Sequence, residues 1–171
     1  NVTTNHRPEP DILLPLLGTT YKAGDKIQFS GAGYDLEDGM ITSESMSWKI
    51  DFHHGTHSHP AMTWAEGIAQ GEWDIPSAGE TATDVFYRIQ LKVIDSEGLV
   101  KVIYRDIFPE TGTIKVETKP AGLIIDLDGT PALTPYFIEG VRGISRYLSP
   151  PDNQVSGDSI YFFTRWSDGS F

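Results

Sequence analysis

The stretch Met46-Ser47-Trp48-Lys49-Ile50-Asp51-Phe52 alternates large apolar side chains with polar ones. Because successive side chains of a β-strand point to opposite faces, Met46, Trp48, Ile50 and Phe52 share one face of the strand. The alternation is the clearest strand signal in the chain. It predicts a sheet whose apolar face forms the core, with the Trp48 side chain inside it.

The same alternation recurs on both sides of this strand. Gly, Pro, Asp and Asn interrupt it at intervals of about ten residues, which is typical of a sandwich of short strands. The turn Asp95-Ser96-Glu97-Gly98 has the residues of a tight hairpin. The other strands are expected at Ile12–Leu17, Lys26–Ser30, Tyr87–Val93 and Leu99–Ile107. The sequence therefore predicts an all-β, immunoglobulin-like β-sandwich over residues 8–109.

A second, smaller β module is expected over residues 113–171, after the break at Phe108-Pro109-Glu110-Thr111-Gly112. Its expected strands are Thr113–Glu117, Leu123–Leu127 and Ile160–Trp166. A module of this size is near the lower limit for an independent core, so it is expected to pack against the first module or to be truncated. Residues 1–7 precede Pro8-Glu9-Pro10 and are expected to form an extended linker.

The composition excludes several classes of partner. Thirteen basic against twenty-four acidic side chains give a formal net charge of −11, which argues against nucleic acid and anionic membranes. The chain has no cysteine, so it has neither a disulfide nor a thiolate site. No apolar run approaches the roughly 20 residues that span a bilayer, so no membrane insertion is expected. The first residues lack the features of a signal peptide, which suggests a part of a longer chain.

Four segments of the first module carry a family resemblance. Gly24-Asp25, the stretch from Phe29 to Gly39, Met46-Ser47-Trp48, and the stretch from Val93 to Leu99 together resemble the PKD-like (polycystic kidney disease repeat) β-sandwich. With His53-His54-Gly55-Thr56-His57-Ser58-His59-Pro60 added, the pattern is similar to modules attached to secreted bacterial sugar dehydrogenases of the glucose/sorbosone type and to other carbohydrate-active proteins.

The resemblance implies an accessory role without catalysis. It also implies a secreted or cell-surface location, bacterial extracellular or periplasmic. Residues 113–171 resemble small β repeats with Pro-Ala-Gly and Trp-Ser-Asp-Gly signatures, which are found at the ends of surface proteins.

Acidic side chains are concentrated in one loop. Asp35, Glu37 and Asp38 lie within four residues, and in an immunoglobulin-like topology the hairpin of Asp95 and Glu97 lies at the same end of the sandwich. Carboxylate and carbonyl oxygens suit Ca²⁺, so the loops are a candidate calcium site. The alternative is a pair of turns in which Asp35 or Asp95 accepts hydrogen bonds from local backbone amides.

Histidines are concentrated directly after the strand through Trp48. On an extended segment His57 and His59 point to one side, and His53 lies on the polar face opposite Phe52. Together with His54, they are candidate ligands for Zn²⁺ or Cu²⁺. The alternative is a loop of exposed or mutually packed histidines. Because the histidines follow this strand, they are expected at the end of the sandwich opposite the carboxylates.

Aromatic side chains in or beside the expected loops are candidates for stacking on sugar rings. They are Trp64, Trp73, Trp166, Tyr34 and Tyr136. Most tryptophans of a small sandwich lie in the core instead, and isolated exposed aromatics are common. Neither Gly-x-Gly-x-x-Gly nor Gly-x-Ser-x-Gly occurs, so nucleotide binding and serine hydrolysis have no motif.

The leading hypothesis is a noncatalytic accessory module of a secreted, multidomain carbohydrate-active protein. Its partners would be a neutral or weakly charged polysaccharide and the other domains of the parent chain, with Ca²⁺ stabilising the loops. A structural spacer or protein-adhesion module is the first alternative. A histidine-rich domain that binds a transition metal, or a small metalloenzyme, is the second.

Overall fold

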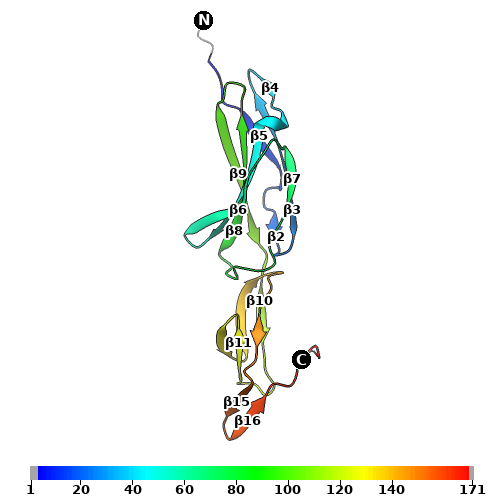
Figure 1. The fold of residues 1–171 in the computed structure, drawn as a ribbon, viewed down its shortest axis with the longest axis vertical. Helices are drawn as coiled ribbons and strands as arrows, with labels where there is room; N and C mark the ends of the chain where they lie inside the picture. The colour runs from blue at the N-terminus through cyan, green and yellow to red at the C-terminus, as the bar shows by residue number, and fades with distance from the viewer. Residues whose placement is uncertain (1–3, 170–171) are drawn as a thin grey trace.

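The computed structural model describes residues 4–169 and shows a chain built of β-strands, which confirms the predicted all-β class (Figure 1). The first module contains β1 (Glu9–Leu14), β2 (Thr20–Tyr21), β3 (Lys26–Asp35), β4 (Gly39–Met40), a short 3₁₀ turn η1 (Ser43–Ser45), β5 (Met46–His54), β6 (His57–Glu66), β7 (Gln70–Asp74), β8 (Val85–Ile94) and β9 (Val100–Pro109). No helix of the described chain is long and apolar enough to cross a membrane.

Two sheets face each other in the first module. One has the order β1-β3-β4, with β7 also paired to β3, and the other is five-stranded in the order β2-β9-β8-β5-β6. The alternation predicted around Trp48 matches the burial, because Trp48, Ile50, Ile89 and Leu91 are each 0 % exposed. Across the core, the rings of Phe29 and Trp48 lie 4.9 Å apart between centroids. The two sheets are therefore joined by one apolar core.

Some strand limits differ from those predicted. The first strand ends at Leu14, before Pro15, instead of continuing to Leu17. The second continues beyond Ser30 to Asp35, where it pairs with β1 and β4. Strands β2, β4, β6 and β7 were not predicted. β6 is an edge strand whose side chains are mostly exposed, so it carries no apolar alternation that a sequence could display.

The second module is made of small sheets. Its strands are β10 (Thr111–Val116), β11 (Ile124–Leu127), β12 (Thr130–Leu133), β13 (Tyr136–Val141), β14 (Leu148–Ser149), β15 (Asn153–Ser156) and β16 (Ser159–Phe162). β10 pairs with β13, β11 lies between β12 and β14, and β15 pairs with β16. The strand predicted to run from Ile160 to Trp166 ends at Phe162, and the chain continues without regular structure.

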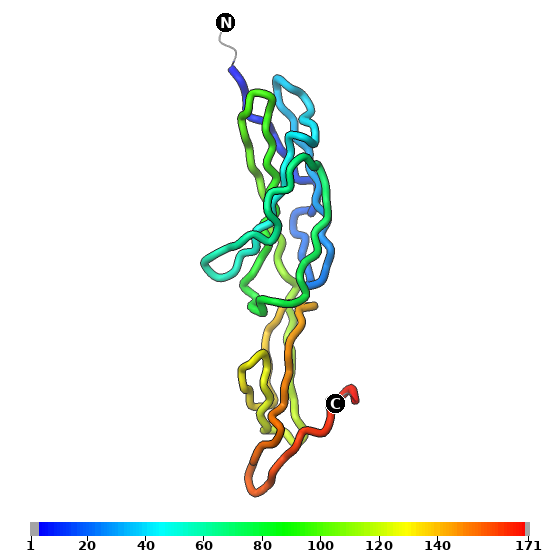
Figure 2. Tube along the Cα trace, viewed as in Figure 1, coloured from blue at the N-terminus to red at the C-terminus, as the bar shows by residue number. Residues whose placement is uncertain are grey.

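The two modules meet end to end (Figure 2). Backbone hydrogen bonds cross the junction from Ala23 N to Arg142 O at 2.8 Å and from Ser145 N to Ser77 O at 2.7 Å. Val141 of the second module belongs to the buried core of the first. The second module therefore packs against the sandwich, and the described N-terminal end lies at the opposite tip of the first module (Figure 2).

Candidate functional site

The clustered histidines lie on a hairpin formed by β5 and β6, which projects sideways from the sandwich (Figure 2). All four histidines belong to strands, so the alternative of a histidine loop was wrong, whereas an extended segment was expected. His54 is the cross-strand partner of His57, and His59 is that of Phe52. His53 points to the other face of the sheet, where its ring stacks on Phe86 at 4.4 Å between centroids.

Three of the four imidazoles gather on one face of this hairpin, where their rings contact one another. The ring centroid of His54 lies 4.0 Å from that of His57 and 5.3 Å from that of His59. His54 Nδ1 also lies 3.7 Å from Glu80 Oε2. Backbone amides of the adjacent loop donate hydrogen bonds to Glu80, those of Ala82 above all, and lower the pKa of its carboxyl group. Glu80 is therefore an ionised acceptor facing an imidazole.

A cavity of about 320 Å³ opens beside these histidines. Aromatic rings form its wall: the centroid of Tyr87 lies 4.8 Å from Trp73, 5.1 Å from Tyr21 and 4.9 Å from Phe52. Burial raises the pKa of Tyr87 to about 12, and burial together with the neighbouring Tyr87 raises that of Tyr21. Both hydroxyl groups therefore keep their protons at neutral pH.

Polar groups and the second module complete this cavity, which we call the histidine pocket. His54, His59 and Glu80 line it beside the aromatic wall, and Val141 and Ile144 line it from the second module. The structure thus brings Trp73, a predicted sugar-binding residue, together with two predicted metal ligands. Its size and its mixture of apolar walls with few polar groups are those of a small-molecule site.

The predicted carboxylates lie at the other end of the sandwich, as expected. Asp35 Oδ1 accepts hydrogen bonds from the amides of Glu37 and Asp38 at 2.9 and 3.0 Å. Asp95 Oδ1 accepts from the amides of Glu97 and Leu99 at 3.0 and 2.7 Å. Both side chains therefore close local turns, which is the alternative that the sequence left open beside calcium.

The two acidic loops are also bonded to each other. Asp38 accepts hydrogen bonds from the amide and the hydroxyl group of Ser96, both at 2.7 Å, and the bond from the amide contributes most to lowering the pKa of Asp38. The loop of Asp35 and the hairpin of Asp95 are therefore held together by side-chain hydrogen bonds at the tip of the sandwich.

The N-terminal segment contacts the same tip. Asn5 Nδ2 donates to Asp95 Oδ2 at 3.2 Å, and His6 Nδ1 lies 2.7 Å from Glu37 Oε1. This contact raises the pKa of His6 and lowers that of Glu37, so it favours the charged form of both. Of the predicted linker, residues 1–3 lie outside the described residues, whereas Asn5 and His6 are bound to the sandwich.

These contacts leave few free ligands for a cation. Asp35 Oδ2 is buried and has no hydrogen-bond partner among the described residues. Within residues 4–169, no three His, Cys, Asp or Glu side chains form a group that could hold a metal ion. Calcium at the carboxylates and Zn²⁺ or Cu²⁺ at the histidines both remain predictions from the sequence.

The other predicted aromatic residues are dispersed over strands and the C-terminal segment. Trp64 lies on β6, 36 % exposed, with Lys92 Nζ 4.7 Å from its ring centroid. Tyr34 is exposed on β3, and Tyr136 lies on β13 in the second module. Trp166 follows β16, and its centroid is 5.0 Å from that of Phe163. Of the predicted sugar-binding aromatics, only Trp73 lines the histidine pocket.

The outer face of the five-stranded sheet carries a further aromatic group that sequence analysis did not predict. Arg88 forms two hydrogen bonds of 2.8 Å with the carboxylate of Asp106, and its guanidinium carbon lies 4.0 Å from the ring centroid of Tyr104. Tyr104 and Phe108 are 59 % and 53 % exposed. Tyr104 and Phe108 alternate with inward-facing residues along β9, so the sequence pattern of that strand could have indicated an exposed aromatic face.

No family model, no curated protein and no solved structure matches this chain. A functional hypothesis therefore depends on the geometry of the pocket and on the resemblance of the sequence motifs.

Proposed function

We propose that this chain is a noncatalytic, PKD-like carbohydrate-binding module of a secreted, multidomain carbohydrate-active protein, and that the histidine pocket binds the glycan. The observation that carries the proposal is the pocket itself. Trp73, Tyr87, Tyr21 and Phe52 provide ring faces, and His54, His59 and Glu80 provide hydrogen-bonding groups beside them.

This combination matches the surface of a sugar ring. A pyranose presents C–H groups on its faces, which pack on aromatic rings, and hydroxyl groups on its rim, which lose hydrogen bonds to water on binding. Imidazole nitrogens and an ionised carboxylate can replace those bonds. The cavity of about 320 Å³ is large enough for one or two sugar residues and not for a long chain segment.

A Trp73→Ala variant tests the proposal. Wild-type protein is titrated calorimetrically with a panel of neutral plant, algal and bacterial polysaccharides. Loss of the ring should weaken binding by about tenfold or more, because one stacked aromatic contributes on the order of 1 kcal/mol beyond its buried area. His59→Ala is a second variant that removes an exposed polar group and leaves the core intact.

Trp64→Ala is the matched control, since Trp64 lies on β6 and does not line the pocket. Its affinity should equal that of the wild type. Absence of binding to every polysaccharide would contradict the proposed function. A loss confined to Trp64→Ala would move the glycan from the pocket to the outer face of the sheet.

Calcium belongs to the same proposal as a stabiliser of the acidic loops. The support is the buried Asp35 Oδ2, which has no hydrogen-bond partner in residues 4–169 and belongs to the loop that is bonded to the Asp95 hairpin through Asp38 and Ser96. A cation that binds only the folded state raises the melting temperature by mass action, so a chelator should lower it and excess Ca²⁺ should restore it. The Asp35→Asn variant should not respond to either. An equal melting temperature with and without chelator would remove calcium from the proposal.

A structural spacer is the second candidate function, and the junction between the modules favours it. Backbone hydrogen bonds join Ala23 to Arg142 and Ser77 to Ser145, and Arg142 N also donates to Glu110 O at 2.8 Å. A joint of this kind fixes the direction of the second module relative to the first. The two functions are compatible in one chain.

A further inference from the structure

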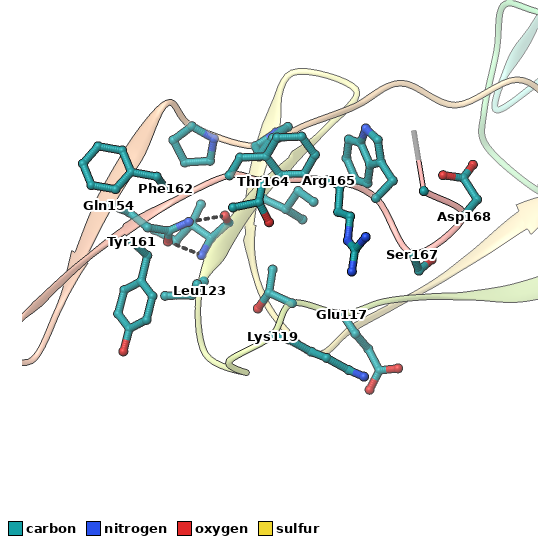
Figure 3. A pocket seen from close by; sticks show the side chains of 18 of the residues that line it. Glu117, Lys119, Leu123, Gln154, Tyr161, Phe162, Thr164, Arg165, Ser167 and Asp168 are labelled. Carbon is teal, nitrogen blue, oxygen red and sulfur yellow. Dashed lines mark hydrogen bonds between the residues drawn. The ribbon is translucent and has the colours of Figure 1, made fainter. Parts of the chain in front are cut away.

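The second module contains a larger cavity, of about 870 Å³, at the end remote from the sandwich. One wall is formed by the segment directly after β10, which includes Glu117 and Lys119. The other is the irregular segment after β16 (Figure 3). Arg165 points from that segment into the cavity (Figure 3). Beside these walls, Gln154 of β15 is bonded to β11, because its side chain accepts from Ile124 N at 2.6 Å and donates to Ile124 O at 3.0 Å.

Positive charge is in excess inside this cavity. Lys115, Lys119 and Arg165 line it together with Glu117 and Asp168, whereas the whole chain has a formal charge of −11. Lys115 forms an ion pair of 2.7 Å with Glu117. Neither Lys119 nor Arg165 has an ion-pair partner within the described chain. Two cations therefore remain available to a ligand.

Aromatic rings line the same cavity as these cations. Tyr161, Phe163 and Trp166 line the cavity, and the rings of Phe163 and Trp166 are inclined at 57° with centroids 5.0 Å apart. A guanidinium group binds a carboxylate through two parallel hydrogen bonds, and an aromatic wall packs against the face of a sugar ring. The combination suits a ring that bears a carboxylate.

We propose that this cavity is a second glycan site, selective for a hexuronate residue. Arg165 and Lys119 bind the carboxylate, and the aromatic wall packs against the ring. The inference rests on the proposed carbohydrate-binding function and names an acidic sugar as the ligand of this module. An acidic peptide would satisfy the cations but would leave the aromatic wall without a matching surface.

The experiment compares an oligogalacturonide with its methyl ester, which keeps every ring and removes the charge. Titrated calorimetrically into the complete chain, the acid should bind about tenfold or more tightly than the ester, because a charge-assisted bond is lost in the ester. Arg165→Gln should abolish the preference. Lys101→Gln removes one positive charge from β9 in the first module, and it should keep the preference.

Several results would overturn the proposal: equal binding of acid and ester, an unchanged preference in Arg165→Gln, an equal loss in Lys101→Gln, or competition by poly-L-glutamate as strong as that by the acid. Trp73→Ala separates the two sites, because it should leave the acid preference unchanged. If a neutral glycan still binds in a Trp73-dependent manner while no acid preference exists, only this second site is refuted. If neither ligand binds, both proposals fail.

Discussion

A Gly143→Ala variant is expected to weaken the joint between the two modules and to lower the melting temperature. Gly143 has a φ of +82°, and a Cβ atom added there would lie 2.2 Å from the backbone oxygen of Ala23. The left-handed conformation costs an alanine about 1–2 kcal/mol, and overpacking adds about 1–3 kcal/mol. Because the contact is with backbone, a side-chain rotation cannot relieve it.

Gly129→Ala is the matched control for this variant. Gly129 lies in the same module with the same φ of +82°, and nothing lies within 4 Å of its added Cβ. Its free energy of unfolding should fall only by the conformational cost of about 1–2 kcal/mol. Thermal denaturation measures both variants, and small-angle X-ray scattering should show a broader distribution of shapes for Gly143→Ala alone. Equal effects of the two substitutions would contradict a close-packed joint.

The joint also matters for the histidine pocket. Val141 and Ile144 line that pocket from the second module, and they flank Gly143 in the chain. If the modules separate, one wall of the pocket moves away from Tyr21 and Trp73. The Gly143→Ala variant should therefore bind glycan more weakly although no pocket residue is changed. Weaker binding in this variant would show that the proposed spacer and binding functions are coupled through one residue.

Sequence alternation predicted the strands that are buried on one face. β5 and β8 alternate because one face of each is buried in the core, and both were predicted close to their observed limits. β6 lacks that signal because it is an edge strand in a projecting hairpin. β7 was missed because Gly71, whose side-chain space is taken by the ring of Phe29, leaves Trp73 as the only large apolar side chain of this short strand.

The candidate site was predicted only in parts. Histidines and tryptophans were chosen as two separate sets, since the sequence cannot show that β7 pairs with β3 and thereby places Trp73 beside the β5–β6 hairpin. Tyr21 and Glu80 were not predicted, because neither belongs to a cluster in the sequence. The shared location of the Asp35 loop and the Asp95 hairpin could be predicted, since each carboxylate begins a turn whose residues are local, whereas calcium there stays a prediction.

Gly31 lies on β3, within the stretch from Phe29 to Gly39 of the first module. A Cβ atom at Gly31 would lie 2.6 Å from Leu91 Cδ2, 2.7 Å from Asp11 O and 3.0 Å from Trp48 Cζ2. Two of these atoms belong to the fully buried core, and the third is backbone of the neighbouring strand β1. Gly31→Ala should therefore destabilise the sandwich by about 3 kcal/mol, the upper part of the range for overpacking.

Gly112→Ala provides the comparison in a strand without the clash. Its added Cβ would meet only the Arg142 side chain, at 3.6 and 3.9 Å, and its free energy of unfolding should stay within about 0.5 kcal/mol of the wild type. Urea denaturation followed by tryptophan fluorescence measures both variants. A Gly31→Ala protein as stable as Gly112→Ala would contradict this, because it would show that the facing sheet can move to accommodate the methyl group at no cost in the free energy of unfolding. The expected difference instead indicates that β3 can approach Trp48 closely only because residue 31 is a glycine. A packing requirement then explains the glycine at this position, without any role in binding.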